Sequence, residues 1–231
     1  METPCATEVG VATRPHTPDD TGADITFAHI DDALLVVRKP AGLLSVPGRG
    51  PQHADCVAAR VQRLYPDALI VHRLDMATSG LLVMARGADA QRRLSRAFAE
   101  RLIDKRYAAV VAGLVAGDHG EVALPLICDW PNRPRQIVDH ACGKPALTRW
   151  RVLSRDETAG TTRVALEPVT GRSHQLRVHL LALGHPIVGD ELYAPPPWRQ
   201  AAPRLLLHAC RLSLAHPVDG RTLTLEDAAP F

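Results

Sequence analysis

The sequence lacks the features of a membrane or secreted protein. No apolar run approaches the roughly 20 residues that a helix needs to cross a bilayer. The first residues include Glu2 and Glu8 and contain no apolar stretch, so they do not resemble a secretory signal. The five cysteines are widely separated and form no C-x-x-C pair, which argues against a disulfide framework and a cysteine zinc site. We therefore expect a cytoplasmic protein.

Motifs for common cofactors are also absent. The chain contains no G-x-x-x-x-G-K-[ST], no G-x-G-x-x-G and no G-x-S-x-G, so an ATP-dependent enzyme, a dinucleotide-dependent enzyme and an esterase all lose their usual support. Aromatic residues make up 4% of the chain, and no aromatic signature of an RRM-type RNA-binding domain occurs. His174 and His179 are five residues apart, which is not the spacing of a helical metal site. We expect neither a cofactor nor a metal.

Charge is distributed unevenly along the 231 residues. Residues 1–24 carry five acids and one base, so residues 25–231 hold a net charge of +6 within an overall +2. Two segments, 86–106 and 133–155, concentrate the cations, most of which are arginine. Arginine suits bidentate contact with phosphate. A basic region of this size is compatible with nucleic acid binding, although a solvated surface explains it almost as well.

The pattern of apolar residues predicts strands and helices that do not alternate regularly. We predict strands at 25–30, 33–38, 81–85, 105–112, 121–126, 146–153, 162–167, 205–214 and 222–225. Together with short turns between neighbouring strands, this order favours an α+β fold with a mixed, mostly antiparallel sheet and flanking helices. Residues 1–24 lack periodicity and are predicted to be a flexible tail, whereas no Gly/Ser linker divides residues 25–231, which we expect to form a single domain.

Three helices are predicted from capping residues and helical spacing. The first extends from Asp55 as N-cap to Leu64, before Pro66. The second begins at Asp89 or Ala90 and places apolar residues on one face as far as Leu102. The third begins after Ser173 as N-cap and ends near residue 183.

Residues 71–80, Val-His-Arg-Leu-Asp-Met-Ala-Thr-Ser-Gly, are the most informative segment. Asp75 follows Arg73 by two residues and lies between two apolar runs, so it is predicted to occupy a loop between ordered elements. A carboxylate fixed beside a cation is a candidate catalytic group. An exposed Arg/Asp pair in an ordinary turn is the more common explanation of such spacing taken by itself.

A second informative segment spans residues 171–179 and carries two arginines near the start of the third predicted helix. Cations there oppose the helix dipole, so Arg172 and Arg177 suggest an anionic partner, either a phosphate or the carboxylate of Asp75. Arginines that extend into solvent are the alternative. Tyr107 offers a flat face and a hydroxyl, although a tyrosine in a strand is more often part of a core.

Five segments, in this order along the chain, resemble the motifs of RluA-type RNA pseudouridine synthases. They are residues 72–75 with 78–80, 105–107, 171–179, 185–190 and 206–209, and the resemblance extends over about residues 25–231. Met76 and Ala77, where many larger relatives have Lys-Asp or Lys-Glu, and residues 124–134 resemble the RluA subgroup itself. Members of that subgroup modify 23S ribosomal RNA and tRNA. Larger relatives carry an N-terminal S4 RNA-binding domain, for which the start of the pattern near residue 25 leaves no room.

The resemblance implies a pseudouridine synthase fold with a central cleft and an isomerase that flips its target uridine out of the RNA. Asp75 would be the catalytic carboxylate, attacking C1′ or removing a proton from C2′, and both roles require its ionised form. Arg177 matches the position of its ion-pair partner. Tyr107 would pack against the uracil and act as a further catalytic residue by helping to remove the proton from C5. The expected substrate-binding residues are His72, Arg73, Thr78, Arg172, Leu206 and Leu207.

The implied partner is RNA, in the form of hairpin loops of 23S ribosomal RNA, the tRNA anticodon stem-loop, or both. The resemblance implies a monomer with no membrane contact and no obligate protein partner. Two other interpretations stay open on the residues alone. One is a synthase-like RNA-binding module that has lost activity. The other is a metal-dependent phosphoesterase using Asp75 with three histidines, His72, His174 and His179.

Overall fold

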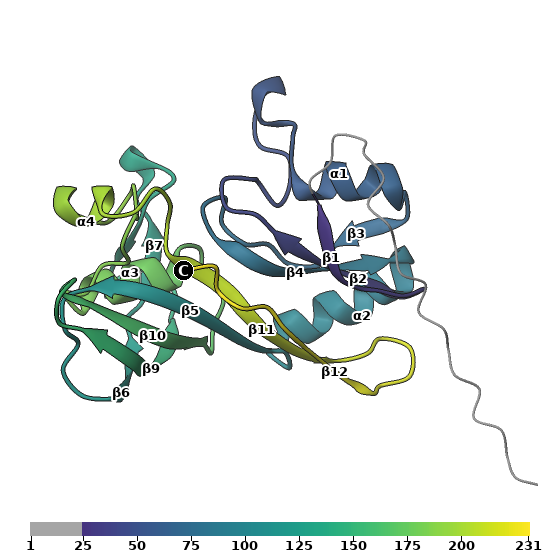
Figure 1. The fold of residues 1–231 in the computed structure, drawn as a ribbon. Helices are drawn as coiled ribbons and strands as arrows, with labels where there is room; N and C mark the ends of the chain where they lie inside the picture. The colour runs from purple at the N-terminus through teal and green to yellow at the C-terminus, as the bar shows by residue number, and fades with distance from the viewer. Residues whose placement is uncertain (1–24) are drawn as a thin grey trace, which may run out of the picture.

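Ten of the twelve strands form one twisted, mixed sheet in the computed structural model, which describes residues 25–231 (Figure 1). The strand order is β1-β2-β4-β11-β5-β10-β9-β6, while β3 pairs with β4 and β12 pairs with β11. Within residues 25–231 the pairing of β4 with β11 is parallel and the others are antiparallel, which confirms the predicted α+β class. The predicted tail, residues 1–24, lies outside the described residues.

The elements have the following bounds. The strands are β1 (Thr26–Ile30), β2 (Leu34–Lys39), β3 (Ala68–Ile70), β4 (Ser79–Arg86), β5 (Asp104–Ala112), β6 (His119–Ala123), β7 (Leu126–Cys128), β8 (Gln136–Val138), β9 (Leu147–Asp156), β10 (Thr161–Pro168), β11 (Leu207–Ala215) and β12 (Thr222–Glu226). The helices are α1 (Val57–Leu64), α2 (Gly87–Ala99), α3 (Gln175–Ala182) and α4 (Pro196–Gln200), with short 3₁₀ turns η1 (Pro51–His53) and η2 (Trp130–Asn132).

The N-terminal half of the sheet is buried on both faces. Strands β2 and β4 are almost entirely apolar, and alternate residues point to opposite sides of a strand. Leu35 and Leu82 pack with Val61 of α1 on one face, whereas Leu34 and Leu81 pack with Leu94 of α2 on the other. Continuous apolar strands of this kind require a helix on each side.

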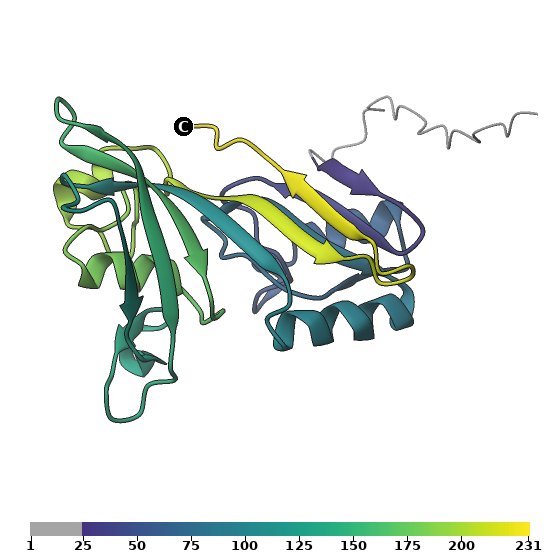
Figure 2. The ribbon, with the colours of Figure 1, turned by 90° about the horizontal axis from the view of Figure 1, so that it is seen from below.

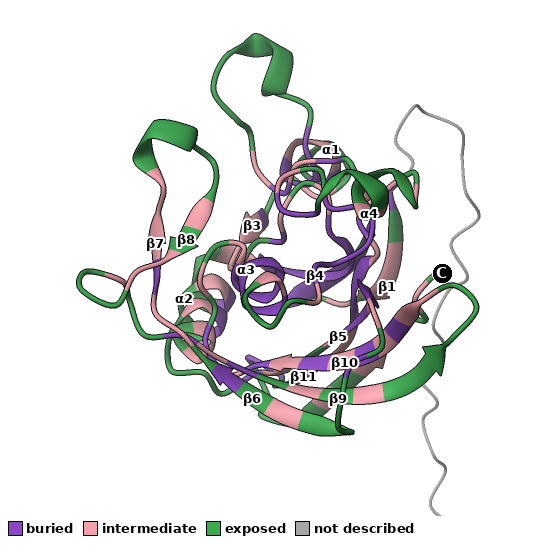
Figure 3. Cartoon of the chain, turned by 90° about the vertical axis from the view of Figure 1, so that its left-hand side faces the viewer, coloured by how far each residue is buried: buried purple, intermediate pink, exposed green. Residues whose placement is uncertain are grey.

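The C-terminal half consists of β6, β9 and β10 with α3 and α4, and the long strands β5 and β11 join the two halves (Figures 1 and 2). Leu176 and Leu180 of α3 pack with Val111 of β5 and Leu166 of β10. Strands β7 and β8 form a separate hairpin whose tip is exposed (Figure 3). No helix among residues 25–231 has the length and apolar character needed to cross a membrane.

Close approach between β4 and β11 depends on Gly80. This residue has φ +112°, and a Cβ atom there would lie 2.3 Å from the carbonyl oxygen of Ala209. Position 80 therefore requires glycine, because any side chain would push β11 away from β4. The contact places the end of the 71–78 loop against the start of β11.

Two predicted helix caps are wrong. The N-cap of α1 is Cys56, whose Sγ accepts a hydrogen bond from the amide of Ala59, while Asp55 forms an ion pair with Arg60. Helix α3 begins after His174 instead of Ser173, because the Gln175 side chain closes the preceding loop by accepting hydrogen bonds there.

Other elements differ from the prediction in extent. Leu102 is 69% exposed and lies beyond α2, which ends at Ala99 where the backbone turns through Arg101 at φ 62°. The strand predicted at 121–126 is divided between β6 and β7. β3, β8 and α4 were not predicted, because they are only three to five residues long and carry little periodicity.

Candidate active site

A cavity of about 500 Å³ lies where the two halves of the sheet meet. Its walls come from the 71–78 loop, the end of α2, β5, the 168–177 segment and the start of β11. Eight of the nine predicted site residues line it: His72, Arg73, Asp75, Thr78, Tyr107, Arg172, Arg177 and Leu207. Leu206 instead packs against the core between β10 and α3. A second cavity of about 560 Å³ shares Asp75, His174 and Arg177 with the first.

A buried lysine holds the loop that carries Asp75 through hydrogen bonds to backbone carbonyl oxygens. Lys39, at the end of β2, is 2% exposed, and its Nζ donates hydrogen bonds to the carbonyl oxygens of Pro40, Leu43 and Met76. Three acceptors match the three N–H groups of an ammonium. Burial lowers the pKa of Lys39 to about 7, although the charge of Asp75 opposes this shift.

Further hydrogen bonds fix the two ends of the same loop. Ser45 Oγ donates to the carbonyl of Leu74 at 2.7 Å and accepts from the Leu74 amide at 3.1 Å. The amide of Thr78 donates to the carbonyl of Asp75 at 3.0 Å. These bonds hold the Asp75 backbone on both sides, so the carboxylate has a defined position at the cavity wall.

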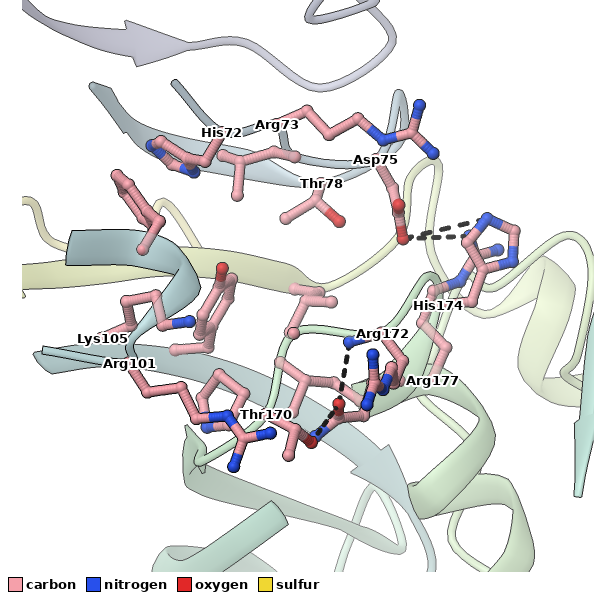
Figure 4. Close-up of a pocket in the computed structure, with 18 of the residues that line it drawn as sticks. His72, Arg73, Asp75, Thr78, Arg101, Lys105, Thr170, Arg172, His174 and Arg177 are labelled. Atoms are coloured by element: carbon pink, nitrogen blue, oxygen red, sulfur yellow. Dashed lines mark hydrogen bonds and ion pairs between the residues drawn. The ribbon is translucent and has the colours of Figure 1, made fainter. Parts of the chain in front are cut away.

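Two side chains from the other half face one oxygen of Asp75. Arg177 Nη1 lies 3.7 Å and His174 Nε2 lies 3.9 Å from Oδ2 (Figure 4). Both groups make their closest approach to Oδ2. Oδ2 is therefore the oxygen that faces the two neighbours, and they approach Oδ1 less closely.

The strongest partner of Arg177 is Asp190, which the sequence analysis did not select. Arg177 Nε and Nη2 donate to the two oxygens of Asp190 at 2.7 and 2.6 Å, and Asp190 is completely buried. Gly189 allows this turn, since a Cβ there would lie 1.9 Å from the carbonyl oxygen of Arg204. The prediction that Arg177 lies beside Asp75 is correct in position, but the bidentate pair is made elsewhere. Arg172, the second candidate, donates to the carbonyl of Pro145.

Tyr107 and His72 are both uncharged in the cavity wall. Burial, and then the charge of Asp75, raises the pKa of Tyr107, so its phenol keeps its proton. Burial lowers the pKa of His72 to about 3. The ring of His72 stacks on Phe98, and its Nε2 accepts a hydrogen bond from the Val83 amide. Nε2 of His72 is thus engaged by the backbone of β4, and its ring forms part of the cavity wall.

Cations dominate the rest of the cavity. Among the described residues that line it, Asp75 is the one carboxylate, whereas the cationic side chains are Arg73, Arg101, Lys105, Arg172 and Arg177. Arg101 and Lys105 lie across the cavity from Asp75 (Figure 4). Burial and the neighbouring Arg101 lower the pKa of Lys105. Such a surface suits a polyanion.

The basic segment 86–106 contributes to the cavity mainly through its last residues. Arg92 pairs with Asp89, and Arg96 donates to Glu100 at 2.7 Å, so both charges on the outer face of α2 are compensated. Arg101 follows the end of α2 and faces inward. The sequence analysis identified the segment but not which of its cations reach the site, because that depends on where the helix ends.

The histidines do not form a metal site. Residues 25–231 contain no group of three or more His, Cys, Asp or Glu side chains placed to hold a metal ion. His179 is buried, with its two ring nitrogens facing Thr148 Oγ1 and the carbonyl of Leu124. The arrangement proposed for a phosphoesterase is therefore not assembled.

Comparison with known proteins gives consistent matches. Residues 33–182 match the family described as RNA pseudouridylate synthase. The Escherichia coli (strain K12) protein named "Dual-specificity RNA pseudouridine synthase RluA" is 56% identical over 209 residues, covering 90% of this chain and 94% of that protein. A protein of the same name from Pasteurella multocida (strain Pm70) is 51% identical over 214 residues, covering 93% and 96%. The solved structure "Human RNA Pseudouridylate Synthase Domain Containing 1" has a TM-score of 0.77 at 28% identity, covering 93% and 87%.

Substitution of Lys39 by methionine tests the effect of its burial on stability. The pKa is 10.5 in a solvated lysine and about 7 in the folded protein, so the unfolded chain binds more protons between these values. The wild-type free energy of unfolding should therefore rise relative to the Lys39→Met variant as the pH increases from 7 to 9, by at most about 1.4 kcal/mol per pH unit. Urea titrations at several pH values measure this, and parallel pH profiles would contradict it.

Removal of the Arg177 guanidinium should destabilise the fold through Asp190. Arg177→Met leaves a fully buried carboxylate without its bidentate partner, and we expect a loss of about 3–5 kcal/mol in the free energy of unfolding. The matched control is Arg172→Met, which removes one hydrogen bond to a carbonyl and should cost below about 1.5 kcal/mol. Equal midpoints of urea unfolding for the two variants would refute the central role of the Asp190 pair.

Proposed function

The chain belongs to the RNA pseudouridylate synthase family, whose members convert uridine to pseudouridine within RNA, and on this premise we propose that Asp75 acts on the ribose of the target nucleotide. The observation that carries the proposal is the asymmetry of this carboxylate. Arg177 Nη1 and His174 Nε2 both approach Oδ2 most closely, at 3.7 and 3.9 Å. Oδ1 is therefore the atom available to the ribose.

The reaction needs a carboxylate but neither an oxidant nor an energy donor. The bond between uracil N1 and C1′ breaks, the uracil turns while held, and its C5 joins C1′. The proton on C5 is then lost and N1 gains a proton, so the reaction is an isomerisation. Asp75 either attacks C1′ or removes a proton from C2′, and both routes require an ionised carboxylate with a free oxygen.

The uracil would lie between Tyr107 and Leu207, which both line the cavity that contains Asp75. Because the pKa of Tyr107 is raised, its ring supports packing against the base more readily than removal of a proton as a phenolate. A base must leave its stack to reach this position, at a cost of a few kcal/mol, which is smaller in a hairpin loop. Arg73 is exposed at the edge of both cavities and is placed to occupy the vacated space.

The RNA proposed as substrate is a hairpin loop of 23S ribosomal RNA, the tRNA anticodon stem-loop, or both. Two relatives that are more than half identical to this chain carry the words "dual-specificity" in their names. The cationic cavity wall supplies contacts for the phosphates that flank the flipped base. We further propose that the enzyme acts as a monomer in the cytoplasm. A synthase-like module without activity is not favoured, because the chain is 51–56% identical to relatives that are named as RNA pseudouridine synthases, over 90% or more of its length.

Substitution of Asp75 by asparagine removes the charge with little change in shape. We expect Asp75→Asn to lower the single-turnover rate on the order of 10³-fold or more while the RNA dissociation constant changes little. Asp32→Asn, at a fully exposed turn position, is the matched control. Mapping of pseudouridine in ribosomal RNA and tRNA from cells that carry each variant measures activity and target together. Pseudouridine formed by Asp75→Asn would exclude Asp75 as the reacting carboxylate.

The cavity cations also predict how salt affects RNA binding. Arg101→Gln removes an inward-facing charge, so the slope of log K against log salt concentration should fall in magnitude by roughly 0.7–0.9. Arg92→Gln removes an outer charge already paired with Asp89 and should alter the slope much less. Binding titrations at salt concentrations from about 50 to 200 mM compare the slopes of the two variants. Identical slopes for both variants would show that the cavity does not hold the phosphates.

A further inference from the structure

His174 adopts a backbone conformation that is unfavourable for its residue type. It has φ 52° and ψ 17°, in the left-handed region, at the first turn of α3. Apart from glycines, Arg101 is the other described residue with positive φ, and both line the cavity. Strain of about 1–3 kcal/mol persists where the surrounding structure requires it. The conformation directs the imidazole of His174 toward Asp75 (Figure 4).

The contacts that the two ring nitrogens of His174 make with Tyr193 and Asp75 favour one neutral tautomer. The amide of Gln136 donates to the Tyr193 hydroxyl oxygen at 2.7 Å. The Tyr193 hydroxyl lies 2.7 Å from Nδ1 of His174, and we assign it as the donor to Nδ1, because the opposite tautomer would place the lone pair of Nε2 against the carboxylate of Asp75. In a neutral imidazole the second nitrogen then bears the hydrogen, so Nε2–H faces Oδ2 of Asp75.

The ring of Tyr193 is held as firmly as its hydroxyl. It is 6% exposed, lies at 5.0 Å from the Arg177 guanidinium, and meets the His174 ring edge-to-face. Its amide donates to Asp190, the bidentate partner of Arg177. Tyr193 thus touches both groups that face Oδ2 of Asp75.

We propose that Tyr193 and His174 are positioning residues that aim a neutral Nε2–H at Oδ2 of Asp75 and so turn Oδ1 toward the ribose. The relay begins at Gln136, the first residue of β8, so it connects the β7–β8 hairpin to the reacting carboxylate. This proposal rests on the proposed role of Asp75. It assigns no reacting atom to His174 or Tyr193, which act through the orientation of Asp75.

The test compares Tyr193→Phe with Tyr65→Phe. The first removes the hydroxyl but keeps the ring against Arg177, whereas Tyr65 packs with Phe27 and lines neither cavity. We expect Tyr193→Phe to lower the single-turnover rate at saturating RNA by roughly 10- to 100-fold, because misplacement of a reacting group by about 1 Å has such an effect. The RNA dissociation constant and the melting temperature should stay close to those of Tyr65→Phe.

A second pair of variants examines the donor itself. His174→Gln retains an N–H group near the position of Nε2 and should keep at least several-fold more activity than His174→Ala, with equal RNA binding. Equal rates for this pair, a wild-type rate for Tyr193→Phe, or losses that follow RNA affinity would each overturn the relay. If Tyr193→Phe unfolds, the His174 pair decides the matter. Asp75→Asn is measured in parallel to distinguish a failure of the relay from a failure of the proposed function. Activity of this variant would overturn the role of Asp75 itself.

Discussion

The active site depends on one buried guanidinium that faces two carboxylates. Arg177 donates hydrogen bonds to Asp190 through Nε and Nη2, and its Nη1 lies 3.7 Å from Oδ2 of Asp75. Breaking a buried pair leaves an unpaired charge, whereas the intact pair itself adds little net stability over apolar packing. The Arg177–Asp190 pair contributes mainly by fixing the geometry of the site. The Asp190 bond fixes the plane of the guanidinium, and this plane determines where the remaining nitrogen meets the 71–78 loop.

That geometry requires the two halves of the sheet to meet at a constant distance. Asp75 belongs to the N-terminal half, and Arg177 and Asp190 belong to the C-terminal half, so no local interaction brings them together. The long strands β5 and β11 provide the connection, with Gly80 permitting the close contact between β4 and β11. Lys39 then fastens the Asp75 loop to the end of β2. The cavity is therefore formed by segments that are distant in the sequence and meet only in the folded protein.

The sequence predicted the strands well and the caps poorly, for a physical reason. Apolar strands such as β4 are set by burial, which depends on many residues and leaves a strong periodic pattern. A cap depends on one hydrogen bond, and at Cys56 and Gln175 the sequence offered other plausible donors or acceptors nearby. The partners of Arg177 illustrate the same limit. The motif placed Arg177 near Asp75, but its bond to Asp190 arises from a turn that spacing does not reveal.

The protonation states of the residues that line the cavity restrict the proton-transfer roles that these residues can take. Tyr107 keeps its proton, and His72 is held neutral with its Nε2 already accepting the Val83 amide. Burial also lowers the pKa of His174, although the charge of Asp75 opposes that effect. A neutral imidazole beside an ionised carboxylate donates a hydrogen bond without taking the negative charge away. Fixed cations and neutral hydrogen-bond donors thus surround Asp75 in the cavity wall, and the surroundings of its carboxylate are set before a substrate binds.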